Sequence, residues 1–215
     1  NSHIDSTTPN LARTLQQAGY YTGAVGKNHV IEAKGVSRND GPAEDADPTD
    51  LRVAQYYTEK QQKLVNAFKQ CGFDLAANLY QGNLPGHTCK ALEFHNMDWI
   101  TSAAIEFLDT WSTKDKPFFL FYPTTNIHFP LTPNSRFFGS TKAGVYGEFV
   151  VEFDWAVGEL LAALDRHGLA DNTIVVLSSD NGARPHEDLN SHPCNGPWRG
   201  TKRQIYEGGH RVPLI

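Results

Sequence analysis

The 215-residue sequence lacks several features that would assign it to a class by composition alone. It has no basic excess, because 19 Lys and Arg stand against 24 Asp and Glu, and a net charge of −5 argues against a nucleic-acid-binding surface. It has no run of the roughly 18 consecutive apolar residues that a membrane-spanning helix needs. We therefore expect neither a nucleic-acid nor a membrane partner, and the oligomeric state stays open.

Cysteine is also scarce. Cys71, Cys89 and Cys194 are too few and too scattered for a disulfide framework or a C-x-x-C metal site. One pair could form a disulfide bond in an oxidising compartment, and buried free thiols are the alternative.

The remaining composition, 40% apolar and 20% charged, is typical of a globular domain, and its pattern alternates helix with strand. Apolar spacing predicts a first helix that starts at the Thr8-Pro9 cap. It predicts three further helices, over Asp50–Gln70, Met97–Trp111 and Gly147–His167. Apolar runs predict buried strands over Tyr20–Val25, Phe118–Tyr122 and Thr173–Leu177. This alternation indicates an α/β fold with a mostly parallel sheet flanked by helices. Glu32–Thr49 reads as a surface loop, and Cys71–Leu92 contains no element that the pattern predicts.

Polar residues that could bind a ligand or take part in catalysis follow each predicted strand. Asp180-Asn181 comes after Thr173–Leu177 and offers two oxygen ligands of the kind that Ca²⁺ or Mg²⁺ prefers, although Asp-Asn-Gly is also an ordinary turn sequence. Lys27 and His29 follow the first strand, and His128 follows the second. Because the carboxyl ends of parallel strands meet at one edge of a sheet, these side chains are expected to share one site.

Lys202 completes the candidate set, in a basic stretch ahead of Glu207-Gly208-Gly209. Two lysines, two histidines and a pair of oxygen ligands suit an oxyacid ester. The cations and the metal would neutralise its non-bridging oxygens, and a histidine could protonate the departing oxygen.

Four motifs in this order resemble those of the sulfatase family. LQQAGYYTGAVGKNH at 15–29 is similar to its Ala-Gly-Tyr-x-Thr and Gly-Lys-x-His signature, and PFFLFYPTTNIHFPL at 117–131 resembles its His-x-Pro segment. Residues 169–182 resemble the strand that ends in Ser-Asp-Asn-Gly, and 199–214 resemble its Tyr-Glu-Gly-Gly-x-Arg-Val-Pro-Leu stretch. Together the motifs span nearly the whole chain.

The resemblance implies an alkaline-phosphatase-like fold and hydrolysis of a sulfate ester, on a sugar or an aryl group, by a formylglycine nucleophile. By position, Lys27 and Lys202 would contact sulfate oxygens, and His128 would bind sulfate or assist the leaving group. His29 would bond to the hydroxyl of the nucleophile and help to regenerate its aldehyde. Asp180 and Asn181 would ligate Ca²⁺, with Mg²⁺ as the alternative.

The chain departs from the family in lacking the Cys/Ser-x-Pro-x-Arg motif, which supplies the formylglycine, and the N-terminal Asp-Asp pair. We therefore expect residues 1–215 to be the central part of a sulfatase catalytic domain, incomplete at both ends, without its nucleophile segment and C-terminal subdomain. By itself this polypeptide is expected to be inactive.

Two other readings stay open. One is a phosphomonoester or phosphodiester hydrolase of the same superfamily, and the other is a non-catalytic homologue that binds an anionic ligand. The resemblance implies a periplasmic, secreted or lysosomal protein. Selectivity among sulfated sugars and small molecules is expected to reside in the variable segments 32–49 and 71–92.

Overall fold

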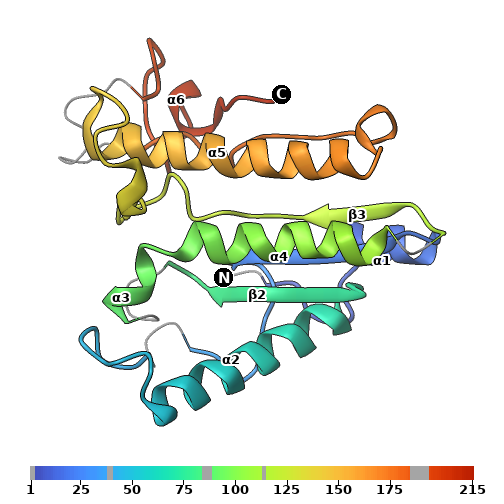
Figure 1. The fold of residues 1–215 in the computed structure, drawn as a ribbon. Coiled ribbons are helices and arrows are strands. Elements are labelled where there is room, and N and C mark those ends of the chain that lie inside the picture. The colour runs from blue at the N-terminus through green and yellow to red at the C-terminus, as the bar shows by residue number, and fades with distance from the viewer. Residues whose placement is uncertain (1–2, 38–40, 84–88, 113–114, 185–193) are drawn as a thin grey trace.

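A three-stranded parallel sheet lies at the centre of the structure, a computed structural model that describes residues 3–37, 41–83, 89–112, 115–184 and 194–215. The strands are β1 (Tyr21–Asn28), β2 (Leu75–Gln81) and β3 (Phe118–Phe121), in the order β2-β1-β3 (Figure 1). β1 pairs in parallel with both neighbours. The predicted α/β class with a parallel sheet is confirmed.

Helices cover both faces of this sheet. The α-helices are α1 (Leu11–Gln17), α2 (Leu51–Gln70), α3 (Lys90–Glu93), α4 (Asn96–Trp111), α5 (Gly144–Arg166) and α6 (Glu207–His210), and two 3₁₀ turns are η1 (Ser135–Phe137) and η2 (Ala170–Asn172). α2 packs on one face, and α4 packs on the other with α5 beside it on the β3 side (Figure 1). The three long helices predicted from apolar spacing are therefore confirmed.

The first helix starts later than the sequence predicts. Its N-cap is Asn10 rather than Thr8, because the Asn10 side chain accepts the backbone N–H of Arg13 at 3.0 Å. The Thr8 hydroxyl instead donates to the Asp5 carboxylate at 2.9 Å, within the preceding turn.

β2 is an element that the sequence pattern did not predict. Its sequence, LAANLYQ, contains no β-branched residue, so the usual signal of a strand is missing. Its pairing with β1 also shifts register between Val25 and Gly26, and Asn78 adopts φ +46°. Burial of Leu79 and Tyr80 on opposite faces of the sheet, rather than local propensity, accounts for the strand.

Two predicted buried strands differ from the structure. Phe118–Phe121 is a strand, but it is only half-buried because it lies at the edge of the described sheet. The prediction for Thr173–Leu177 is wrong: this extended segment is no part of the described sheet, and Ile174 is 92% exposed. Its pairing is with the C-terminal residues, through two hydrogen bonds between Leu177 and Ile215. The apolar run that predicted burial therefore faces solvent.

All three cysteines are free thiols, and Cys71 and Cys89 are buried. The sequence left open a disulfide bond or free thiols, and the structure has free thiols.

Phe107 joins α4 to the sheet. It is fully buried, stacks on Tyr21 with ring centroids 5.6 Å apart, and meets Phe118 edge-on at 6.0 Å. Gly23 makes room for its ring, because a Cβ there would lie 2.3 Å from it. One side chain thus ties α4 to both β1 and β3.

Replacing Phe107 with Ala is expected to lower the free energy of unfolding by about 3–5 kcal/mol, because it leaves a cavity between α4 and the sheet. Phe138→Ala is the matched control, since Phe138 is 58% exposed, and it should cost under about 1 kcal/mol. Urea unfolding measures both. Equal losses in the two variants would contradict this account of the core.

Candidate functional site

Lys27 lies at the carboxyl end of the central strand, where a close backbone approach fixes its place. Its N–H donates to the Pro123 carbonyl, beyond β3, at 2.8 Å. Gly26 permits this contact, because it adopts φ +108° and a Cβ there would lie 2.2 Å from the Pro123 oxygen. The end of β1 is thereby joined to the segment that leads to His128.

His128 is half-buried in the loop that follows β3. Its N–H donates to the Thr125 carbonyl at 2.7 Å, and its Nδ1 lies 2.7 Å from the Phe129 carbonyl oxygen. A carbonyl oxygen can only accept, so Nδ1 carries the hydrogen in this contact. In the neutral ring Nε2 is then the atom with a free lone pair.

The charges around His128 come from three separate parts of the chain. Burial lowers the pKa of His128, the bond to Phe129 opposes this, Lys27 and Lys202 lower the pKa further, and Asp180 raises it. These three charged residues therefore lie close enough to act on one imidazole. The structure brings together four of the six residues that the sequence proposed for one site.

Asp180 and Lys202 are placed by glycine contacts between two neighbouring segments. The N–H of Gly182 donates to Gly209 O at 2.9 Å, and a Cβ on Gly182 would lie 1.9 Å from Gly208 O. The N–H of Lys202 donates to the carbonyl of Ala183 at 3.1 Å. The Asp-Asn-Gly and Glu-Gly-Gly sequences are thus adjacent because neither has a side chain at the point of contact.

The other two proposed residues are placed by their neighbours in the chain. His29 is exposed and lies directly after β1, two residues beyond Lys27. Asn181 is half-buried beside the exposed Asp180, and its carbonyl accepts the Ser179 hydroxyl at 3.0 Å.

Asp180 and Asn181 fit a metal such as Ca²⁺ in the type of donor that they offer, a carboxylate and an amide oxygen next to one another. They can supply only part of the six to eight oxygen ligands that Ca²⁺ takes. Among the described residues, no group of three or more His, Cys, Asp and Glu side chains is arranged to hold a metal ion.

Sequence reasoning missed the polar residues that hold the His128 loop. Glu152 of α5 is 1% exposed, and its carboxylate accepts hydrogen bonds from Asn126 and Asn134, on either side of His128. The four-residue spacing of Glu148, Glu152 and Ala156 could have shown this, because it places all three on one side of the helix, which is buried.

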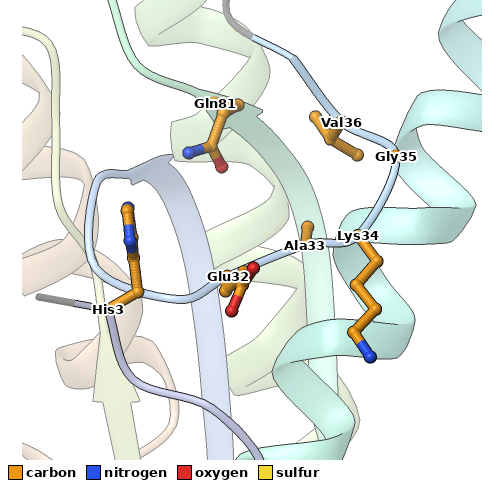
Figure 2. A pocket seen from close by; sticks show the side chains of 7 residues that line it. All are labelled: His3, Glu32, Ala33, Lys34, Gly35, Val36 and Gln81. Carbon is orange, nitrogen blue, oxygen red and sulfur yellow. The ribbon is translucent and has the colours of Figure 1, made fainter. Parts of the chain in front are cut away.

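A pocket of about 380 Å³ lies at the carboxyl ends of β1 and β2, between the chain after β1 and α2 (Figure 2). It is lined by His3, Glu32, Ala33, Lys34, Gly35, Val36 and Gln81. Gln81 is buried there and accepts the Asn28 amide at 2.6 Å. Apart from His3, these residues lie in the two segments, 32–49 and 71–92, where the sequence predicts substrate selectivity.

None of the helices among the described residues has the length and apolar character required to cross a membrane.

Lys27 lies at the carboxyl end of β1 and His128 follows β3, and cations placed in this way can stabilise the oxygens of an oxyacid ester. Residues 2–215 match the sulfatase family, and the chain belongs to that family.

Curated relatives of the chain are also sulfatases. Over 126 residues the chain is 39% identical to an N-acetylgalactosamine-6-O-sulfatase of Bacteroides thetaiotaomicron, a match that covers 55% of this chain and 24% of the relative. It is 45% identical over 104 residues to the steryl-sulfatase of Rattus norvegicus, covering 46% and 18% respectively. The matched part thus spans a quarter or less of these curated relatives.

Solved structures share the fold. A sulfatase structure from work on glycosaminoglycan metabolism by Bacteroides thetaiotaomicron aligns with a TM-score of 0.72 at 24% identity, covering 100% of this chain and 56% of that one. The PsFucS1 sulfatase from Pseudoalteromonas sp. aligns at 0.62 and 26% identity, covering 95% and 43%. The alkaline-phosphatase-like architecture that the motifs imply is therefore shown.

Removing the Lys202 charge is expected to raise the pKa of His128, because a cation beside the ring disfavours the imidazolium form. Lys202→Met tests this by NMR titration of histidine ring resonances. Lys116→Met is the control, because Lys116 precedes β3 at the opposite end of the sheet and is not among the groups that act on His128. An unchanged or lower pKa in Lys202→Met would show that Lys202 does not face the imidazole.

Proposed function

We propose that the protein containing this chain hydrolyses a sulfate ester, and that Lys27, His128, Lys202 and Asp180 form part of its active site. The observation that carries the proposal is that Lys27, at the end of β1, is joined through Pro123 to the segment that leads to the half-buried His128, on which Lys27, Lys202 and Asp180 act electrostatically. Family membership supports the same reaction class.

The two lysines would bind the sulfate group of the substrate. Lys27 and Lys202 come from segments 175 residues apart, so they can approach the sulfate from different sides. Charge builds up on the oxygens as the S–O bond breaks, and fixed cations in a site of low dielectric stabilise that charge strongly.

His128 would serve the leaving oxygen. Burial and the lysines lower the pKa of His128, which favours the neutral ring with Nε2 unprotonated before substrate binds. A bound sulfate ester brings negative charge that offsets the lysines, so its arrival favours protonation at Nε2. The imidazolium can then donate this proton to the alcohol oxygen.

Two further groups complete the proposed site. The sulfatase family uses a formylglycine and a divalent metal, and when bound these supply the nucleophile and a counter-charge for the sulfate oxygens. Asp180 and Asn181 would contribute two oxygen ligands to the metal, for which we propose Ca²⁺. His29 would hold a proton of the nucleophile, as the family motif implies.

We propose a sulfated sugar as the substrate. The Bacteroides relative is named as an N-acetylgalactosamine-6-O-sulfatase, and one structural relative was solved with a neocarrahexaose. The pocket beside β1 offers a carboxylate, an ammonium group and an amide, which are groups that bind sugar hydroxyls. A periplasmic, secreted or lysosomal location would suit such a substrate.

The full-length protein is expected to release sulfate from sulfated sugars or an aryl sulfate, and Lys27→Ala or Lys202→Ala should lower kcat/KM about 10²- to 10³-fold, as for loss of one charge-stabilising donor. Lys116→Ala should leave kcat/KM unchanged. Ion chromatography of released sulfate gives the rates, and a parallel series with phosphate esters separates the alternatives. Faster turnover of phosphate than of sulfate esters favours the phosphohydrolase, and no turnover of either favours the binding homologue.

Calcium is expected to stabilise the full-length protein against thermal unfolding, by about 2.7 kcal/mol at one hundred times its dissociation constant. Asp180→Ala should abolish most of this gain because it removes the charged ligand. Asp154→Asn, an exposed carboxylate on α5, is the control and should retain the gain. The comparison is made after EDTA treatment, with Ca²⁺ or Mg²⁺ added back. An equal gain in Asp180→Ala would place the metal elsewhere.

A further inference from the structure

The loop that carries His128 has little regular structure to hold it. It runs from the end of β3 to η1, and on the ribbon it lies beside the N-terminal part of α5 (Figure 1). The hydrogen bonds of His128 itself are local, from its backbone N–H to Thr125 and from its ring Nδ1 to Phe129. The position of the imidazole therefore depends on what attaches the loop to the helices.

One buried carboxylate attaches the loop at both ends. Glu152 Oε2 accepts the Asn126 side-chain amide at 3.1 Å, and Glu152 Oε1 accepts the backbone N–H of Asn134 at 3.1 Å. The Asn126 amide also donates to the Phe149 carbonyl of α5 at 3.0 Å. His128 lies between the two attached residues, two positions after the first and six before the second.

Neighbouring polar groups strengthen both attachments. Thr125 donates to the side chain of Asn96, on α4, at 2.9 Å. The Asn134 side chain donates to Asp98 at 2.9 Å, and Asp98 forms an ion pair with Arg136 at 2.6 Å. The loop is thus connected to α4 as well as α5, and Glu152 is the residue common to its two ends.

A carboxylate is a costly choice for this position. Burial raises the pKa of Glu152, the bonds from Asn126 and Asn134 lower it, Asp98 raises it and Arg136 lowers it. A buried carboxylate without adjacent countercharge destabilises a fold unless its hydrogen bonds compensate. The gain is geometric: a carboxylate can accept two donors at once from opposite directions.

We propose that Glu152 is a positioning residue of the active site, which acts through Asn126 and Asn134 to hold the loop that carries His128 in place. The expected effect on turnover rests on the proposed function, whereas the expected effect on the position of the His128 ring does not.

Glu148 gives a matched control on the same helix. It lies one turn earlier, is 9% exposed, and accepts a single hydrogen bond, from the N–H of Gly139 at 2.7 Å. Gly139 lies beyond the His128 loop. Glu148→Gln and Glu152→Gln therefore make the same chemical change in similarly buried places, and only the second touches the loop.

The geometric test is independent of turnover. In the full-length protein with ¹³C-labelled histidine, Glu152→Gln should shift or broaden the ring resonance of His128, assigned with His128→Gln, because one of its two acceptors becomes a donor. Glu148→Gln should leave that resonance in place. If Glu152→Gln does not fold, Asn126→Ala removes the partner of the same bond and should have the same effect. An unmoved His128 resonance in the variant that folds overturns the proposal.

The kinetic test is a double-mutant cycle with a sulfate ester. Glu152→Gln should lower kcat about ten- to hundredfold, the scale of a misplacement near 1 Å, with little change in KM. In a His128→Ala background the same change should lower kcat less than about threefold, because the group it positions is gone. Glu148→Gln should have equal effects in both backgrounds. Full additivity for Glu152→Gln would refute the proposal, whereas a wild-type protein without turnover refutes the proposed function and leaves the NMR result to decide.

Discussion

The hydrogen bond from the N–H of Lys27 to the carbonyl of Pro123 is the contact on which the site depends most directly. It joins the end of the central strand to the segment that leads to His128. It exists because Gly26 has no side chain and adopts φ +108°. Gly182 serves the same purpose on the other side, where the Asp180 segment lies against Gly208 and Gly209. Close backbone contacts at glycine thus join the end of β1 to the His128 segment, and the Asp180 segment to residues 208–209.

The electrostatics of the assembled site follow from this proximity. Burial and two lysines lower the pKa of His128, and Asp180 raises it. Such a site favours anions, and an arriving anion in turn favours protonation of the histidine. In the proposed mechanism, binding and proton donation are linked through the His128 ring, whose loop is held at both ends by the buried Glu152.

Several elements could be predicted from the sequence because their signals are local. The apolar stripes of α4 and α5 predicted both helices. The apolar runs also predicted where Lys27 and His128 lie, at the end of β1 and after β3. β2 could not be predicted, since LAANLYQ owes its strand to pairing with β1 and to burial on both faces. The apolar run Thr173–Leu177 predicted burial, yet no strand of the described sheet pairs with it, and it lies exposed.

The sequence by itself determined the family, the class of fold and the identity of the candidate groups, because motif order and side-chain chemistry are written in the chain. Tertiary structure alone decided which segments lie together, since the contacts of Gly26 with Pro123 and of Gly182 with Gly208 join residues far apart in the chain. It also decided the role of Glu152, because the sequence alone does not show which residues this helical carboxylate contacts. Its two hydrogen bonds reach residues 26 and 18 positions away, and only the folded chain brings them within reach.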